Sequence, residues 1–314
     1  MNRHAFILVS LLAVCGAPSQ QPASVDDLFQ SVEEWVRGNL DDTVRQALQN
    51  IDQERALALL DQLLQRLQKE NIYDLATLKQ GVLGLVPLLD QFEETQPYSI
   101  WLRTRLDYLD AAEQLRRELP PAPPPKKGVP APLTVPRPAP PLQLQRSVWT
   151  KQLEKRPLPP RAQAYVPKLK PIFLAEKVPA ELVWLAEVES SFEPRAKSPS
   201  GAAGLFQLMR PTAKTLGLST WFPDERLNPE KSARATAKYL HHLHERFGDW
   251  RLALAAYNAG EGRVNELLKK SKTRSFDAIA SRLPSETQLY VPKVEATVRK
   301  REGRALAELK MPKG

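Results

Sequence analysis

The sequence predicts an all-α protein with a leader, a separate small helical module, a proline-rich linker and a larger helical domain. Apolar residues recur at helical spacing on both sides of a proline-rich stretch, and no segment alternates like a half-buried strand. The stretch itself, residues 120–142, has 11 prolines in 23 positions, which is typical of an extended spacer. The expected boundaries are 1–19 for a signal peptide, 20–119 for the module, 120–160 for the linker and 161–305 for the larger domain.

Residues 1–19 have the composition of an export signal. Arg3 and His4 precede an apolar run, residues 5–14, that is too short to span a bilayer. Cys15 is the only cysteine, so an internal disulfide is excluded. Its place after the apolar run predicts a lipid anchor, whereas the small residues before position 20 predict plain cleavage after Ser19. Either outcome places the mature chain in the periplasm or cell envelope.

Charge divides the chain into two unlike parts. Residues 24–119 carry 10 Lys/Arg and 18 Asp/Glu, a net of −8, whereas residues 143–314 carry 31 and 18, a net of +13. This asymmetry predicts two different roles, and a basic exported domain suits an anionic polymer or lipid. Nucleic acid is not expected, because the basic stretches lack interleaved aromatic residues and match no nucleic-acid motif.

The acidic module shows strong helical periodicity. Residues 51–70 place Leu60, Leu63, Leu64 and Leu67 on one face, and residues 98–119 form a further amphipathic pattern. No catalytic constellation is visible there. Residues 25–119 are therefore interpreted either as a docking module for a protein partner or as a small bundle that spaces or orients the domain after the linker.

A helix that is apolar almost all round begins near Pro179 and ends with two acidic residues, Glu187 and Glu189. Residues two positions apart on a helix point in directions that differ by roughly 200°, so the two carboxylates cannot both face one cleft. From this pattern alone, a glutamate at the helix end is either solvated or held in a cleft wall.

Five blocks after residue 160 carry a family resemblance. In order they are VESSFEP (188–194), KSPSGAAGLFQLM (197–209), DERLNP (224–229), FGDWRLALAAYNAGEGRV (247–264) and ETQLYVPKV (286–294). Together they resemble the catalytic domain of lytic transglycosylases, glycoside hydrolase family 23, which has a lysozyme-like α fold. The lead-in over residues 165–190 is most similar to the membrane-bound D type. The resemblance covers about residues 160–300.

The resemblance implies cleavage of the β-1,4 bond between N-acetylmuramic acid and N-acetylglucosamine in peptidoglycan, with formation of a 1,6-anhydro end and without a cofactor. Glu189 matches the sole general acid and base of the family. A carboxyl group can donate a proton near neutral pH only if its pKa is raised, as burial would do. Seven further residues match substrate-binding positions of the family: Ser190, Ser198, Gln207, Met209, Tyr257, Asn258 and Tyr290.

The chain departs from the family pattern at Arg210, which stands where a proline is usual, and this arginine could touch an anionic part of the substrate. His241 and His244 share a helix face but have no third ligand at useful spacing, so no metal site is expected. Two alternatives remain open. One is a goose-type-lysozyme-like hydrolase of the same bond, and the other is a non-catalytic wall-binding scaffold.

Overall fold

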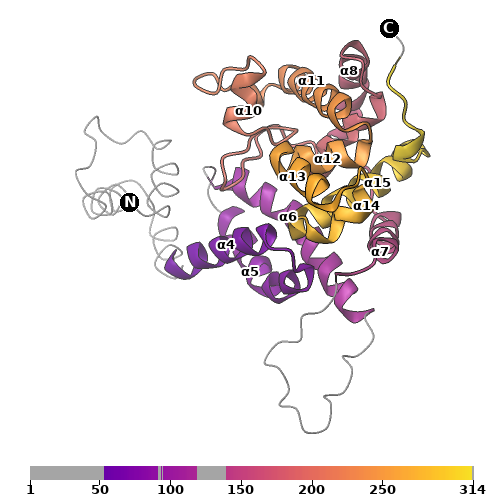
Figure 1. Ribbon diagram of the computed structural model, residues 1–314. Coiled ribbons are helices and arrows are strands. Elements are labelled where there is room, and N and C mark those ends of the chain that lie inside the picture. Colours follow the sequence, from indigo (N-terminus) through magenta and orange to yellow (C-terminus); the bar gives the residue numbers. More distant parts are fainter. Residues whose placement is uncertain (1–52, 91–92, 94, 119–138, 313–314) are drawn as a thin grey trace.

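The structure is a computed structural model that describes residues 53–90, 93, 95–118 and 139–312 (Figure 1). The predicted signal peptide, Cys15, the first part of the acidic module and most of the proline-rich stretch lie outside the described residues.

Helices make up nearly all of the regular structure. Those before the proline-rich stretch are α4 (Gln53–Gln68), the 3-10 helix η1 (Ile72–Leu78), α5 (Lys79–Asp90) and α6 (Gln96–Arg117). Those after it are α7 (Leu142–Glu154), α8 (Ala162–Ala175), η2 (Ala180–Trp184), α9 (Leu185–Ser190), α10 (Arg210–Thr215), η3 (Glu225–Leu227), α11 (Pro229–Phe247), α12 (Trp250–Ala259), α13 (Glu261–Ser271), α14 (Phe276–Ile279), η4 (Ala280–Arg282), α15 (Ser285–Glu302) and η5 (Leu306–Glu308).

The all-α prediction is confirmed for the part of the chain that the structure describes. Its only β-type pairings are isolated bridges from Ala203 to Lys197 and Leu208, within one loop. None of its helices is long and apolar enough to cross a bilayer.

The helices on the two sides of the proline-rich stretch share one hydrophobic core. Fully buried residues of α6, such as Leu102 and Tyr108, belong to the same apolar cluster as Phe206 and Leu289 of the larger domain. Figure 1 shows the indigo and purple helices α4 to α6 lying against the orange and yellow ones. The structure thus corrects the prediction of a separate module, because helices that bury their apolar faces on each other form one folded body.

Hydrogen bonds reinforce this union where α15 begins. The Ser285 hydroxyl donates to the carbonyl of Arg66 at 2.7 Å, and the Gln288 amide donates to the carbonyl of Glu70 at 2.7 Å. These carbonyls lie at and just beyond the end of α4, where a helix leaves its last acceptors unpaired. The end of α4 is therefore completed by side chains from more than 200 residues further along the chain.

Helix α7 lies where the sequence predicted linker. The expected boundary at residue 160 is wrong, since residues 142–154 are helical and bury Val148 and Trp149 completely. Trp149 meets Tyr108 of α6 edge to face, with ring centroids 5.6 Å apart. Such a contact contributes about 1 kcal/mol beyond its buried area. The linker prediction extended too far because prolines flank this short amphipathic segment on both sides.

The helix that carries the two glutamates ends at Ser190. Ser191 and Phe192 both adopt positive φ, 52° and 61°, which stops the helical ladder. The Phe192 N–H bonds back to the carbonyl of Ala186, and its ring is completely buried. Burial of this aromatic side chain offsets the cost of the left-handed backbone.

A loop spanning residues 196–209 folds back beside the end of α9. Its position depends on Gly204, whose φ is +85° and whose missing Cβ would come within 1.9 Å of the carbonyl oxygen of Arg226. The Arg226 guanidinium donates to the carbonyls of Gly201 and Leu208 at 2.7 and 2.9 Å. The close approach of Gly204 and the hydrogen bonds of Arg226 thus fix the loop, which supplies one side of the candidate site.

Candidate active site

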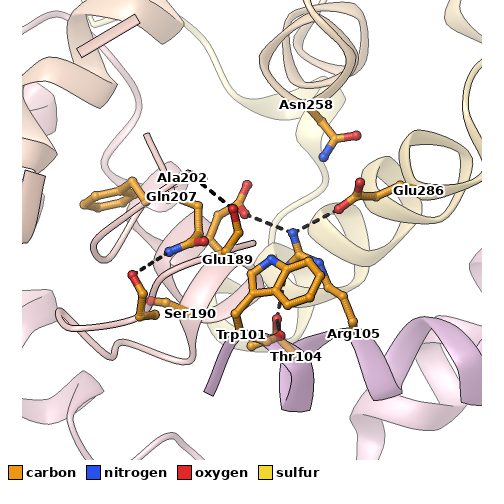
Figure 2. Close-up of polar contacts among 12 residues, drawn as sticks. Trp101, Thr104, Arg105, Glu189, Ser190, Ala202, Gln207, Asn258 and Glu286 are labelled. Atoms are coloured by element: carbon orange, nitrogen blue, oxygen red, sulfur yellow. Dashed lines mark hydrogen bonds and ion pairs between the residues drawn. The ribbon is translucent and has the colours of Figure 1, made fainter. Parts of the chain in front are cut away.

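Glu189 is the buried carboxyl at the centre of the candidate site. It occupies the last turn of α9, and only 4% of its surface is exposed. Figure 2 shows it beside Arg105 and Gln207, which come from α6 and from the 196–209 loop. Burial at this position follows from the fold, because all six residues of α9 are buried and its Leu185, Ala186 and Val188 belong to the hydrophobic core.

Arg105 connects Glu189 with a second carboxyl. Its Nη2 atom lies 3.9 Å from Oε2 of Glu189 and donates to Oε1 of Glu286 at 2.9 Å. The two carboxyl oxygens are therefore within about 7 Å of each other, on opposite sides of one guanidinium. Arg105 itself is only 5% exposed, so the three charges interact with little screening by solvent.

The pKa of Glu189 is raised from 4.5 to about 7. Burial is the main cause, because it penalises the charged carboxylate. Arg105, Tyr290 and Lys293 lower that pKa, and Glu286 raises it. The Tyr290 hydroxyl does not meet strict hydrogen-bond geometry, yet it lies close enough to favour the ionised form. Glu189 can therefore be protonated at near-neutral pH and still give up its proton.

Glu187 points elsewhere, as the helical spacing required. Its two oxygens accept hydrogen bonds from Nη2 and Nε of Arg301, at 2.7 and 2.9 Å. Both side chains are at least nine-tenths buried. Glu187 is thus held in a buried ion pair with Arg301.

The 196–209 loop brings Gln207 next to the carboxyl. Its Nε2 donates to the carbonyls of Ala196 and Gly204, at 3.1 and 2.9 Å, while its Oε1 is buried without a partner. The residue also has a φ of 48°. Such strain and an unpaired buried acceptor are costly and are common where a protein binds a ligand.

The two predicted serines bond within the loop. The Ser190 hydroxyl is fully buried and lies 2.8 Å from the carbonyl of Leu205 and 3.1 Å from that of Ala186. The Ser198 hydroxyl accepts from the N–H of Ala202 at 3.0 Å. The Ser190 contact with Leu205 holds the loop against α9, and the Ser198 contact closes a turn within the loop.

The remaining predicted residues surround the site at different depths. The Tyr257 hydroxyl donates to the carbonyl of Phe206 at 2.7 Å. Burial is the main cause that raises the pKa of Tyr257, and the charge of Glu189 raises it further. Asn258 accepts from the Thr287 hydroxyl at 2.6 Å, and Figure 2 shows it across from Arg105. Tyr290 is fully buried, whereas Met209 is 41% exposed at the start of α10.

The histidines sit apart from these residues. His241 Nδ1 lies 3.0 Å from the carbonyl of Glu176, and its Nε2 is 3.3 Å from Glu245. Within the described ranges no three His, Cys, Asp or Glu side chains are grouped so as to hold a metal ion.

Arg105 and Glu286 were not predicted as site residues. Arg105 follows Trp101 by four positions and precedes Tyr108 by three, so all three share one face of α6. A charged residue in the middle of an apolar face was a signal for a buried ion pair. The signal was missed because α6 was assigned to a separate module.

The comparisons with known proteins show which family part of this chain resembles. Residues 175–280 match the Transglycosylase SLT domain. The membrane-bound lytic murein transglycosylase D of Escherichia coli is 40% identical over 140 residues, which are 43% of this chain and 31% of the relative. The membrane-bound lytic murein transglycosylase F of Vibrio cholerae is 36% identical over 141 residues, 39% of this chain and 25% of the relative.

The chain thus spans less than a third of the length of these relatives. Among solved structures, the 70 kDa soluble lytic transglycosylase of Escherichia coli is 20% identical with a TM-score of 0.44, over 90% of this chain and 50% of that one. The resemblance to lytic transglycosylases is therefore confirmed by sequence: residues 175–280 match the Transglycosylase SLT domain, and both relatives are named lytic murein transglycosylases.

Proposed function

We propose that this protein is a peptidoglycan lytic transglycosylase with Glu189 as its sole general acid and base. The observation that carries the proposal is a buried carboxyl whose pKa is raised to about 7, inside a segment that matches the SLT domain. The two relatives are named for the same activity on murein.

In the proposed reaction Glu189 donates its proton to the glycosidic oxygen between N-acetylmuramic acid and N-acetylglucosamine. The bond from that oxygen to the muramyl C1 breaks, and the 2-acetamido group stabilises the positive charge that develops there. The muramyl C6 hydroxyl then attacks C1 and returns a proton to Glu189. One carboxyl serves both proton transfers, so Glu286, which is engaged with Arg105, is not required as a nucleophile.

The neighbouring residues support a sugar-binding cleft beside this acid. The unpaired Oε1 of Gln207 is a free acceptor for a sugar hydroxyl or amide. We assign substrate contacts to Gln207, Met209, Asn258 and Tyr290. Ser190, Ser198 and Tyr257 contribute by holding the 196–209 loop, through the hydrogen bonds described above.

Mass spectrometry of sacculi digested by the wild-type chain and by Glu189→Gln tests the function. The wild type should release 1,6-anhydro muropeptides, and Glu189→Gln should lose at least about a hundredfold in rate, the usual contribution of a general acid. Glu187→Gln is the matched control on the same helix and should give the same products as the wild type. Products with reducing ends and no 1,6-anhydro ends would instead identify a hydrolase, and activity in Glu189→Gln would exclude Glu189 as the acid.

We also propose that the chain acts in the cell envelope after export through residues 1–19. The apolar run at 5–14 supports the signal peptide, and two of the relatives are named membrane-bound. The mass of the mature N-terminus distinguishes a lipid on Cys15 from cleavage after Ser19. An uncleaved N-terminus would contradict both.

A further inference from the structure

One charged residue of the site comes from the part of the chain before the proline-rich stretch. Arg105 lies on α6, before the proline-rich stretch, whereas the SLT match begins at residue 175. Among the described residues it is the only cation that forms an ion pair with Glu189. Lys293 also influences Glu189, but its amine is paired with Asp107 at 2.9 Å.

The position of the guanidinium does not depend on Glu189. Nη1 donates to the Thr104 hydroxyl at 2.9 Å, and the shorter of its two carboxyl contacts is with Glu286. The rings of Trp101 and Tyr108 lie beneath it, with centroids 5.0 and 5.6 Å from Cζ. A cation held by a carboxylate and two aromatic faces stays in place when a third neighbour changes its charge.

We propose that Arg105 is a positioning residue for Glu189, shared with Glu286, and that helix α6 therefore completes the active centre of the SLT domain. The inference rests on the proposed role of Glu189 as the acid. During the proposed reaction Glu189 is neutral before proton donation and ionised after it. The guanidinium at 3.9 Å stabilises the ionised stage at a buried position, where an unpaired carboxylate would be very costly.

Sharing the cation prevents this stabilisation from becoming too strong. Arg105 is nearer to Glu286, at 2.9 Å, than to Glu189, at 3.9 Å. A dedicated arginine lowers a carboxyl pKa by roughly 1–3 units, which would keep Glu189 ionised at neutral pH and unable to donate. With Glu286 taking the closer contact, burial still dominates and Glu189 remains protonatable.

The ionisable groups that interact with Glu189 come from three helices. On α6 they are Arg105 and Tyr108, on α12 Tyr257, and on α15 Glu286, Tyr290 and Lys293, while Glu189 itself belongs to α9. Of these, Arg105 and Glu286 act on the pKa of Glu189 in opposite directions. This opposition gives the inference a test that a purely structural role would not pass.

The test compares Arg105→Met with Glu286→Gln in the full chain. The pH dependence of muropeptide release from sacculi is measured, and the Glu189 carboxyl is titrated by carbon-13 NMR. Arg105→Met should move the alkaline limb and the carboxyl titration to higher pH by about one unit or more. Glu286→Gln should move both to lower pH, because it removes a negative neighbour and leaves Arg105 to Glu189.

Two further variants are controls. Arg103→Met lies on the same helix, but Arg103 is 54% exposed and pairs with Asp90, so its profile should match the wild type. Arg105→Lys keeps the charge and should bring the limb back toward the wild-type pH. If circular dichroism shows that Arg105→Met does not fold, Glu286→Gln alone tests the inference, through its shift of the alkaline limb and the carboxyl titration to lower pH.

A loss of rate in both variants with no shift of the alkaline limb or the Glu189 titration would overturn the inference. So would shifts of the two variants in the same direction. The NMR titration separates this outcome from failure of the proposed function. If the wild type released no 1,6-anhydro products while the Glu189 titration still shifted in opposite directions, the transglycosylase assignment would be wrong and the role of Arg105 would stand.

Discussion

Replacing Glu189 by glutamine should make the folded protein more stable above neutral pH, while it removes activity. The folded-state pKa of Glu189 is raised from 4.5 to about 7, mainly by burial. A raised folded pKa means that the folded state holds the proton more tightly than the unfolded state, so stability falls as the pH rises from 4.5 to 7. At about 1.36 kcal/mol for each pKa unit, the ionised carboxylate costs roughly 3 kcal/mol above pH 7.

The assay is urea unfolding of wild type and Glu189→Gln from about pH 4 to about pH 9. The difference in unfolding free energy should be small at the acid end and reach roughly 3 kcal/mol in favour of the variant at the alkaline end. Glu245→Gln, which alters a carboxyl that is 67% exposed, is the control and should stay within about 0.5 kcal/mol of wild type at every pH. A difference for Glu189→Gln that is constant with pH, or largest in acid, would refute the reasoning.

Two other substitutions test how the site is held. Gly204→Ala should lower the unfolding free energy by at least about 3 kcal/mol, because the new Cβ would strike the Arg226 carbonyl. Gly217 has a similar φ of +83° but open space around it, so Gly217→Ala should cost only about 1–2 kcal/mol. Equal losses of the two variants in urea unfolding would exclude the steric argument. Glu187→Ala leaves Arg301 without its buried partner and should cost about 3–5 kcal/mol, with unchanged product chemistry at a temperature where it is folded. A shifted pH profile in Glu187→Ala would show that Glu187 acts on the acid directly.

The choice between the two glutamates could be made from the sequence. Helical geometry requires Glu187 and Glu189 to face different ways, and the resemblance of the block VESSFEP (188–194) to the family selects Glu189. The structure places Glu187 on Arg301 and Glu189 beside Arg105. Local spacing predicted this well because both residues belong to one short helix, where side-chain directions follow directly from the sequence.

The partners of Glu189 could not be predicted in the same way. Arg105 precedes it by 84 positions and Glu286 follows it by 97, so only the tertiary fold brings them together. The hydrogen bond of Tyr257 could not be predicted either, since its acceptor is the backbone carbonyl of Phe206, and a backbone atom leaves no sequence pattern. Predictions failed where a contact joined distant helices through groups that carry no periodic signal.

The proline-rich stretch connects two helices that belong to one core. Helix α6 ends at Arg117 and α7 begins at Leu142, and Tyr108 and Trp149 hold the two helices together. Separating them over the reach of a spacer would expose these rings, at about 1.5–3 kcal/mol for each large apolar side chain. Closing a longer loop is cheap by comparison, since doubling its length costs only about 0.6 kcal/mol. The stretch therefore serves to join the arginine-bearing helix to the acid-bearing domain, and its length does not measure a distance between them.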